Sequence, residues 1–516
     1  MSLAELAPPA SASTKEPGRS FAWTFERWTI LLLALGIGWR VLRYVLQFPV
    51  WGDEAMLCAN FLDRGYLDVF DGMWHAQVAP ILFVWTEMTI VHWWGGSELV
   101  VRLVPIVAGL AALPVFWRFT RQIADRPTAM LALALLSVSY FPVRHAVEVK
   151  PYSLDLLLAA LLLLLASRWM ACPKHLSGLV MLGAILPVAL GYSNPLVFVA
   201  GGVMLALLPT VWRASGTARL VYMTAGVGLI GSFLVYLQMN VWMQTGAPPG
   251  AMQRYWASAF PPADPVALLK WLVNIHTSGL MAYPLGGKNG ASTFTFLLVL
   301  LGIWRFAREK RWQLLVLLLS PFALTLIAAA LRRYPYGESA RVAQHLVPAI
   351  IVLAASGLMH AIALGVSMQR RSLAIHLAFV GLVTVGCVGI VRDAVQPFKT
   401  TSDQECREVI RAIDEFVGPD RPIVYLGNWR NDGSEFTWNL RQRHPDIVRT
   451  APIDWNSLHS RRSVVCVRPS LNPAPGALPE APSGWRLVGQ TRFMRSLPAY
   501  PDRTEFIDAF ELEYRP

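Results

Sequence analysis

The chain has 516 residues, of which 54% are hydrophobic and only 15% are charged. In soluble proteins about a quarter of the residues are charged, so this composition excludes an ordinary soluble enzyme and predicts a polytopic membrane protein. The formal net charge of +12 does not indicate nucleic-acid binding, because most basic residues lie in short loops between apolar segments. That placement is typical of cytoplasmic anchoring.

Residues 1–26 are polar and predict a disordered cytoplasmic tail before a membrane helix at 27–48. No small-residue cleavage site follows this apolar run, so we expect a retained helix rather than a signal peptide. Further apolar segments follow, and together they predict an all-α bundle of about eleven transmembrane helices. These segments lie at 99–119, 127–143, 152–171, 176–192, 195–211, 217–240, 291–307, 312–331, 342–364 and 373–391.

Basic clusters mark alternate loops between these segments, and the positive-inside rule places such loops in the cytoplasm. The clusters lie at 118–126, 168–174, 213–219, 305–311 and 369–371. The N-terminus is then cytoplasmic and the chain after residue 395 is periplasmic or extracellular. We therefore expect a multi-pass protein of the inner (plasma) membrane.

Residues 80–94 (PILFVWTEMTIVHWW) are apolar but short, and they contain Glu87 and His92. If they formed a transmembrane helix, every later loop would lie on the opposite side of the membrane, and the basic clusters would face outwards. We instead expect an amphipathic helix that lies at the outer interface, where tryptophan side chains are favoured. Residues 49–98 then form one long external loop with two short helices.

Residues 396–516 combine strand-like runs with helical ones, which predicts a small extracytoplasmic α/β domain. The five cysteines of the chain show no CxxC spacing, which argues against a metal cluster. Cys406 and Cys466 could pair outside the membrane, but Cys466 lies in the apolar run 464–467. That run favours a buried free thiol.

Four groups of polar residues lie on the outer side in this topology, where ionisable groups near the membrane are costly and usually functional. The first is Asp53 and Glu54, which follow Trp51 in the stretch PVWGDEAM (49–56). The same acids could also simply begin an interfacial helix, because the helix dipole favours acids in a first turn. The position of the pair, directly after a close approach to the membrane, favours a functional site.

The second group is His75 and Gln77, although a lone histidine is most often a surface or capping residue. The third is Glu148, Lys150 and Tyr152, at the outer end of one span and the start of the next. Glu148 and Lys150 could pair with each other. Lys150 is nevertheless a cation outside the membrane beside a helix start, where an anion would be favoured.

The fourth group is Arg332, Arg333 and Arg341, with Tyr334 between them and His345 one turn further on. Three external arginines contradict the positive-inside bias. Guanidinium groups are the preferred partners of phosphate, which favours an anion-binding role. Anchoring of outer lipid headgroups is the alternative.

The order of these four groups along the chain resembles that in the polyprenyl-phosphate-sugar-dependent GT-C glycosyltransferases. The similar members are bacterial enzymes of the dolichyl-phosphate-mannose–protein mannosyltransferase-like group, which includes the lipid A aminoarabinose transferases and the Rgt-type enzymes. The resemblance covers about 25–395 and is most specific at 49–56 and 144–155. It implies a GT-C catalytic domain over 27–395, with an outer cavity that takes a lipid-linked sugar from the membrane side and an acceptor from the periplasm.

The resemblance also implies roles for individual residues. Asp53, with Glu54 beside it, corresponds to the acidic residue that acts as general base or orients the acceptor. The leaving group is a phosphate, which cations should hold; the candidates are Lys150, Arg341, Arg332 and Arg333. The expected cavity residues are Trp51, His75, Gln77, Glu148, Tyr152, Tyr334 and His345. Many members carry Pro-Pro where this chain has Ala79-Pro80, which weakens any phosphate or metal role for the stretch around Gln77.

No cofactor is expected: some relatives bind a divalent metal through acids of the first loop, but no His/Asp cluster accompanies them here. The expected partners are a polyprenyl-phosphate (undecaprenyl-phosphate or similar) sugar donor, the bilayer, and an acceptor glycan, lipid or protein. We expect neither nucleic acid nor an obligate protein partner. A lipid or oligosaccharide flippase is the alternative, but it predicts mid-span charges and an internal repeat. A non-catalytic scaffold protein would leave Asp53 replaceable.

Overall fold

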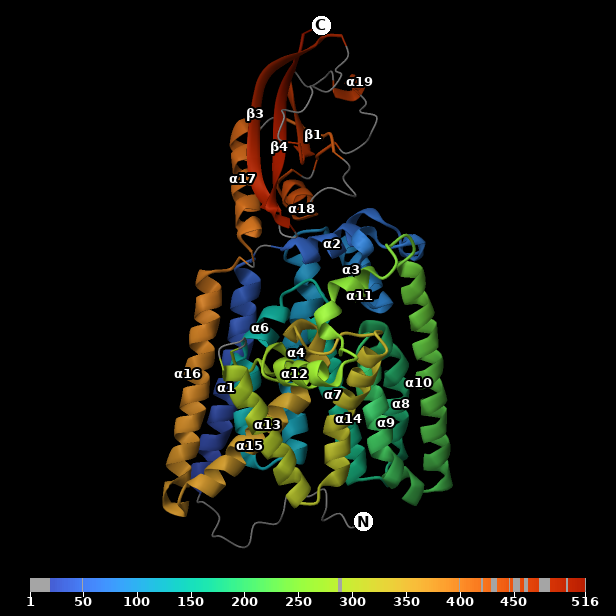
Figure 1. The fold of residues 1–516 in the computed structure, drawn as a ribbon, viewed down its shortest axis with the longest axis vertical. Helices are drawn as coiled ribbons and strands as arrows, with labels where there is room; N and C mark the ends of the chain where they lie inside the picture. Colours follow the sequence, from blue (N-terminus) through green and yellow to red (C-terminus); the bar gives the residue numbers. More distant parts are fainter. Residues whose placement is uncertain are drawn as a thin grey trace.

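The computed structural model describes residues 19–48, 50–285, 290–398, 400–418, 421–427, 434–444, 446–448, 455–458, 463–472, 483–497 and 500–515. Most of the expected N-terminal tail lies outside these residues, and the first helix begins at Arg19, earlier than expected. A bundle of long helices carries a small α/β domain on one end, and the first helix begins at the other end (Figure 1).

Each expected span is matched by a helix. Within the described part of the chain, nine helices are long and apolar enough to cross a membrane, and α5 and α8 are apolar but shorter. The matching helices are α1 (Arg19–Val45), α4 (Leu103–Ile123), α5 (Arg126–Val138), α7 (Tyr152–Ala171), α8 (Leu176–Tyr192), α9 (Leu196–Arg213), α10 (Gly216–Met243), α13 (Ala291–Arg308), α14 (Trp312–Ala330), α15 (Val347–Gly365) and α16 (Arg371–Val395). The protein is therefore a multi-pass membrane protein.

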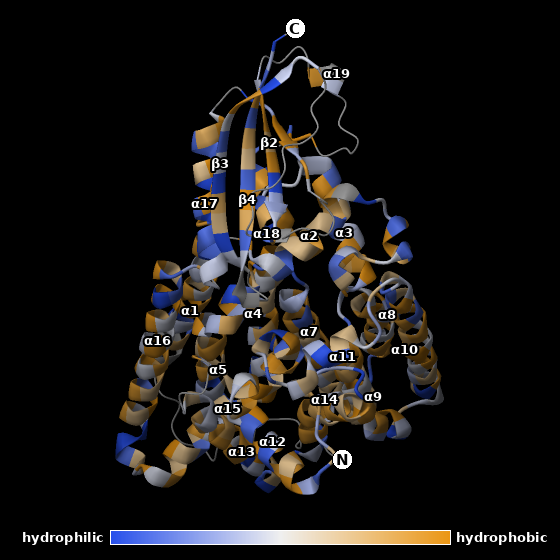
Figure 2. Ribbon diagram, turned by 45° about the horizontal axis from the view of Figure 1, so that its top comes forward, coloured by the Kyte–Doolittle hydropathy of each residue, from blue (hydrophilic) through white to orange (hydrophobic). Residues whose placement is uncertain are grey.

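The helices differ in how much of their surface the protein itself covers. In the most apolar stretch of α7, 72% of the residues are buried, against 11% in α10 and 17% in α16. Helix α7 therefore lies in the core, where it packs against α4, α9 and α15. Helices α10 and α16 lie on opposite flanks of the bundle and expose apolar side chains (Figure 2). Such a surface suits lipid rather than water.

Two glycines allow α13 and α15 to cross at very short range. A Cβ atom at Gly302 would lie 2.0 Å from the carbonyl oxygen of Leu353, and one at Gly357 would lie 1.8 Å from that of Leu298. No side chain fits at such distances, so this backbone contact requires glycine at both positions. Just before α15 lies the 3₁₀ segment η7 (Ala340–Leu346), which contains Arg341.

The first external loop lies at the end of the bundle that carries the α/β domain (Figure 1). It contains α2 (Gly52–Asp63), η2 (Asp68–Asp71), η3 (Trp74–Ala76), α3 (Ile81–Trp94) and η4 (Val100–Arg102). The turns between α9 and α10, α13 and α14, and α15 and α16 lie at the opposite end. Shorter elements in the other connections are α6 (Tyr140–His145), α11 (Ala251–Tyr255), η5 (Ala257–Ala259), α12 (Pro265–His276), η6 (Gly279–Met281) and η8 (Met368–Arg370).

Helix α3 forms as expected but is not amphipathic. Apolar residues surround it, and Glu87, which should mark a polar face, is fully buried. The helix is covered by α2 and α8, so the face that carries Glu87 meets protein instead of water. Burial raises the pKa of Glu87 well above its usual range, because desolvation disfavours the charged form. The exposed tryptophans are confined to the end of the helix, at Trp93 and Trp94.

The C-terminal domain is a four-stranded sheet with helices. Its elements are α17 (Thr401–Val417), β1 (Ile423–Tyr425), α18 (Ser434–Arg443), α19 (Trp455–Leu458), β2 (Ser463–Ser470), β3 (Trp485–Leu497) and β4 (Tyr500–Tyr514). The strand order is β1-β2-β4-β3; β1 and β2 are parallel and the other pairs are antiparallel. Successive residues of β2 join two separate hydrophobic clusters, one on each face of the sheet, and α17 and α18 cover one of them.

Cys406 and Cys466 are free thiols, which confirms the interpretation that they do not pair. Cys406 belongs to the cluster beneath α17, whereas Cys466 points into the cluster on the other face of the sheet. Burial raises the pKa of each thiol to about 12. Both cysteines are therefore packing residues.

Candidate functional site

The two adjacent acids at the start of α2 have different environments. Glu54 is buried and accepts hydrogen bonds from the backbone N–H groups of Trp51 (3.3 Å) and Val149 (2.6 Å). The first of these is a capping interaction at the start of a helix, and the second ties α2 to the segment before α7. Glu54 is therefore a structural residue, and the helix-start alternative holds for this acid.

Asp53 points instead into a cluster of polar side chains from distant parts of the chain. Its Oδ1 lies 3.1 Å from Nζ of Lys150, and its Oδ2 lies 3.4 Å from Nη1 of Arg341. Gln77 joins the cluster, because its Oε1 accepts a 2.7 Å hydrogen bond from Lys150 and its Nε2 lies 3.5 Å from Oδ1 of Asp53. One carboxylate and two cations give this cluster a net positive charge, which suits an anionic ligand.

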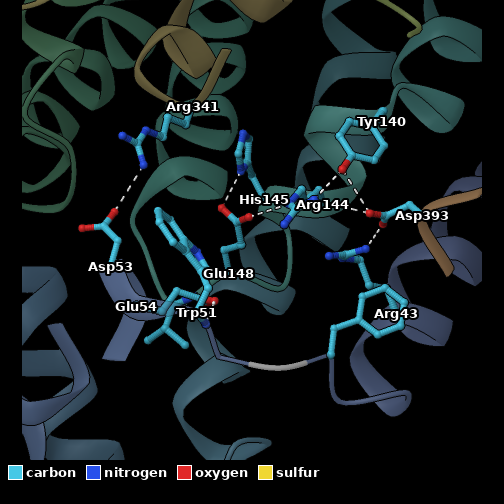
Figure 3. Close-up of polar contacts among 12 residues, drawn as sticks. Arg43, Trp51, Asp53, Glu54, Tyr140, Arg144, His145, Glu148, Arg341 and Asp393 are labelled. Atoms are coloured by element: carbon cyan, nitrogen blue, oxygen red, sulfur yellow. Dashed lines mark hydrogen bonds and ion pairs between the residues drawn. The ribbon is translucent and has the colours of Figure 1, made fainter. Parts of the chain in front are cut away.

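Aromatic rings surround the guanidinium group of Arg341 on several sides. It lies 5.6 Å from the ring centre of Trp51, 5.9 Å from that of Tyr255 and 4.9 Å from that of Trp256. Its Nη2 donates a 2.8 Å hydrogen bond to the hydroxyl of Tyr255. These cation–π contacts fix the direction of the guanidinium group towards Asp53 (Figure 3).

A cavity of about 330 Å³ opens beside Arg341. A second arginine, Arg144, also lines it, so two guanidinium groups border one space. The lining residues are Trp51, Tyr140, Phe141, Arg144, His145, Tyr255, Ser339 and Arg341. Together with the cluster around Asp53, this cavity forms the candidate site.

An ion-pair network behind the cavity holds Arg144. Its Nε lies 2.8 Å from Oε1 of Glu148, whose other oxygen lies 2.8 Å from Nδ1 of His145. Nη1 of Arg144 lies 3.4 Å from Oδ1 of Asp393, at the end of α16. Asp393 also pairs with Arg43 of α1 (Figure 3). Burial by itself would lower the pKa of Arg144, but Glu148 and Tyr140 together more than compensate, and the pKa is raised.

The remaining predicted residues divide between the site and its surroundings. Tyr152 stacks edge-on against His145, with ring centres 5.0 Å apart, and so lies against the cavity wall. Tyr334 and His345 pack together against Phe198 of α9, and His345 lies 3.1 Å from the hydroxyl of Thr325. They support η7 from within the bundle but do not line the cavity.

Three predicted residues lie elsewhere. Arg332 and Arg333 are exposed after the end of α14 and line neither cavity described here. His75 lines a second cavity of about 430 Å³, between η3 and the segment that follows α10. Burial lowers the pKa of His75, although nearby Glu435 opposes that shift.

The sequence interpretation missed Arg144, Asp393, Arg43, Tyr140 and Tyr255. Arg144 could have been found, because it precedes Glu148 by four residues, the spacing of a helical ion pair, and belongs to the same expected loop as Glu148 and Lys150. Within the described residues, no group of three or more His, Cys, Asp or Glu side chains is placed to hold a metal ion.

The network at Asp393 leads to a stability prediction. Arg43 and Asp393 are both buried, so Asp393→Asn leaves an arginine without its charge partner and should destabilise the protein by roughly 3 kcal/mol. Thermal unfolding of the purified protein in detergent measures the change. The double variant Arg43→Met/Asp393→Leu removes both charges and should recover much of the loss. A double variant less stable than either single variant would contradict this interpretation.

No family model and no curated protein sequence matches the chain. Among solved structures, the crystal structure of ArnT from Cupriavidus metallidurans in the apo state is similar over 95% of this chain and 98% of that chain, with 11% identity and a TM-score of 0.46. The structure of ArnT bound to undecaprenyl phosphate covers the same shares at 11% identity, with a TM-score of 0.47.

Proposed function

We propose that this protein is a GT-C-type membrane glycosyltransferase, which moves a sugar from a polyprenyl-phosphate donor to an acceptor on the periplasmic face. The observation that carries this proposal is the meeting of Asp53, Lys150 and Arg341 at one end of the membrane helices. A phosphate leaving group needs cations, and an attacking hydroxyl group needs a base. The cluster supplies both within one hydrogen-bonded group.

The proposed reaction is a direct displacement at the anomeric carbon of the donor sugar. The acceptor oxygen bonds to that carbon while its proton passes to the carboxylate of Asp53. The bond between the carbon and the phosphate oxygen breaks, and polyprenyl phosphate leaves with the electron pair. Lys150 and Arg341 stabilise the charge that develops on the phosphate. Arg144, which lines the same cavity as Arg341, offers the donor a second guanidinium group.

The donor also changes the surroundings of the base. Without a donor, both cations contact Asp53 itself. A bound phosphate competes for Lys150 and Arg341, and a carboxylate that loses these contacts becomes available to accept a proton. Donor binding thus prepares Asp53 for the acceptor. A divalent metal at Asp53 would be repelled by both cations, so we propose a reaction that requires no metal.

We propose that the site faces the periplasm, with the N-terminus in the cytoplasm of a cell bounded by the inner membrane. The positive-inside rule supports this orientation, because basic residues cluster in the turns at the opposite end, such as 305–311 and 369–371. The acceptor is a glycan, a lipid or a protein. Neither nucleic acid nor an obligate protein partner forms part of the proposal.

The test is an assay of the purified full-length protein in lipid nanodiscs with an undecaprenyl-phosphate-linked sugar. We expect release of undecaprenyl phosphate when an acceptor is present, at a rate unchanged by EDTA. Mass spectrometry of surface glycans and glycolipids, from cells with and without the gene, identifies the sugar and the acceptor. Movement of the intact donor between the two leaflets of sealed proteoliposomes, without its cleavage, would favour a flippase and contradict the proposal.

A further inference from the structure

Helix α18 of the C-terminal domain packs directly on α2, the helix whose first turn carries Asp53 (Figures 1 and 2). Trp438 is 3% exposed and belongs to the hydrophobic cluster of the first external loop, with Val50, Cys58 and Phe61. The side chain of a C-terminal helix is thus part of the core of another region of the chain. This contact is a packed interface rather than a loose approach between domains.

A second contact lies at the start of α2. A Cβ atom at Gly52 would lie 3.1 Å from Oε2 of Glu435, so this carboxylate lies against the helix N-terminus, directly beside Asp53. An acid at that position is favoured by the helix dipole. The other oxygen of Glu435 pairs with buried Arg495 of β3 at 2.8 Å. The sheet therefore orients the carboxylate that contacts α2.

Two further contacts join the domain to the end of the same loop. Gln442 donates a 2.7 Å hydrogen bond to the carbonyl oxygen of Gly96, and Arg407 of α17 lies 3.0 Å from Glu98. Glu98 in turn lies 3.4 Å from Arg102, which donates a 2.6 Å hydrogen bond to the carbonyl oxygen of Phe48. The domain thus holds the first loop at its beginning and at its end.

We propose that the C-terminal domain positions the catalytic base: Glu435 and Trp438 hold the first turn of α2 so that Asp53 stays within reach of Lys150 and Arg341. This inference rests on the proposed function. Both residues act through α2, so they are positioning residues. A displacement of about 1 Å at a reacting group can lower a rate about 10²-fold, so loss of this support should reduce turnover strongly.

The test compares kinetic constants of full-length variants in nanodiscs. Trp438→Ala should lower kcat about 10²-fold and leave the KM for the donor within about twofold, whereas Trp438→Phe should retain most of the turnover. Glu435→Gln should lower kcat in the same way by a smaller factor. The matched controls are Trp485→Ala, which removes a buried tryptophan from the other face of the sheet, and Asp508→Asn, which removes the buried carboxylate on Arg492. Both controls should lower thermal stability but keep kcat. Equal losses of kcat in the controls, or full turnover in Trp438→Ala, would overturn the proposal.

A second readout is independent of sugar transfer. Cys58 is fully buried in the cluster that contains Trp438, and burial raises its pKa well above the usual range, so it should resist maleimide. Peptide mass spectrometry should show faster labelling of Cys58 in Trp438→Ala and unchanged labelling in Trp485→Ala. If the wild-type protein transfers no sugar, the proposed function fails, but this labelling still tests the docking. Unchanged labelling in Trp438→Ala would overturn the positioning role.

Discussion

Replacing Asp53 with asparagine should abolish sugar transfer while the protein remains folded. Asparagine has the same shape and can still accept a hydrogen bond from Lys150, but it cannot take the proton of the acceptor. Lys150 also keeps its hydrogen bond to Gln77. Loss of general-base assistance lowers rates by about 10²–10⁴-fold. Initial rates of polyprenyl-phosphate release and the thermal unfolding temperature measure the two effects.

Two variants of the same loop serve as controls for Asp53→Asn. Asp68→Asn alters an exposed acid outside the cluster and should keep the wild-type rate. Glu54→Gln alters the buried acid that holds the start of α2 and should lower the unfolding temperature more than Asp53→Asn, which leaves the backbone contacts of α2 intact. Full activity of Asp53→Asn would rule out this residue as the base.

Replacing Arg341 with alanine should weaken donor binding and slow transfer together. The arginine contributes charge to the bound phosphate and to the leaving phosphate, and removal of one such group costs about 10²–10³-fold in rate. Arg341→Lys keeps the charge but loses the fixed direction that Trp51, Tyr255 and Trp256 impose, so it should recover only part of the activity. Donor KM, kcat and the affinity for undecaprenyl phosphate alone are the measurements.

The control for this series is Arg254→Gln. Arg254 neighbours Tyr255 on α11 but is exposed and donates a hydrogen bond to the carbonyl oxygen of Pro249. It does not line the cavity, so donor affinity should stay at the wild-type value. An equal loss in both variants would indicate a general attraction for anionic lipid instead of a donor site at Arg341.

The membrane bundle and the centre of the candidate site could be predicted from the sequence, for one physical reason. A long apolar run can cross a membrane only as a helix, and the charges of the loops between such runs predict on which side each loop lies. Asp53, Lys150 and Arg341 were selected because the charge pattern predicts that all three lie on the same side of the membrane, and the fold brings them together. The sequence could not separate Asp53 from Glu54, because their roles differ only through the partners that each meets.

Contacts between distant segments were beyond the reach of the sequence. Arg144 and Asp393 are 249 residues apart, and no local pattern links the two. For the same reason α3 was expected to be amphipathic: the charge of Glu87 is visible in the sequence, whereas the helices that cover it are not. The packing of Trp438 of the C-terminal domain into the first loop is a third example.

The crossing of α13 and α15 places a constraint on the site from within the helix bundle. Gly302 and Gly357 set how closely the two helix axes approach, and the outer end of α15 continues into the segment that holds Arg341. A single added methyl group at either glycine would spread the axes and tilt that end. Under the proposed function, substitutions at these positions should then impair donor recognition, although neither glycine lines the cavity of the candidate site.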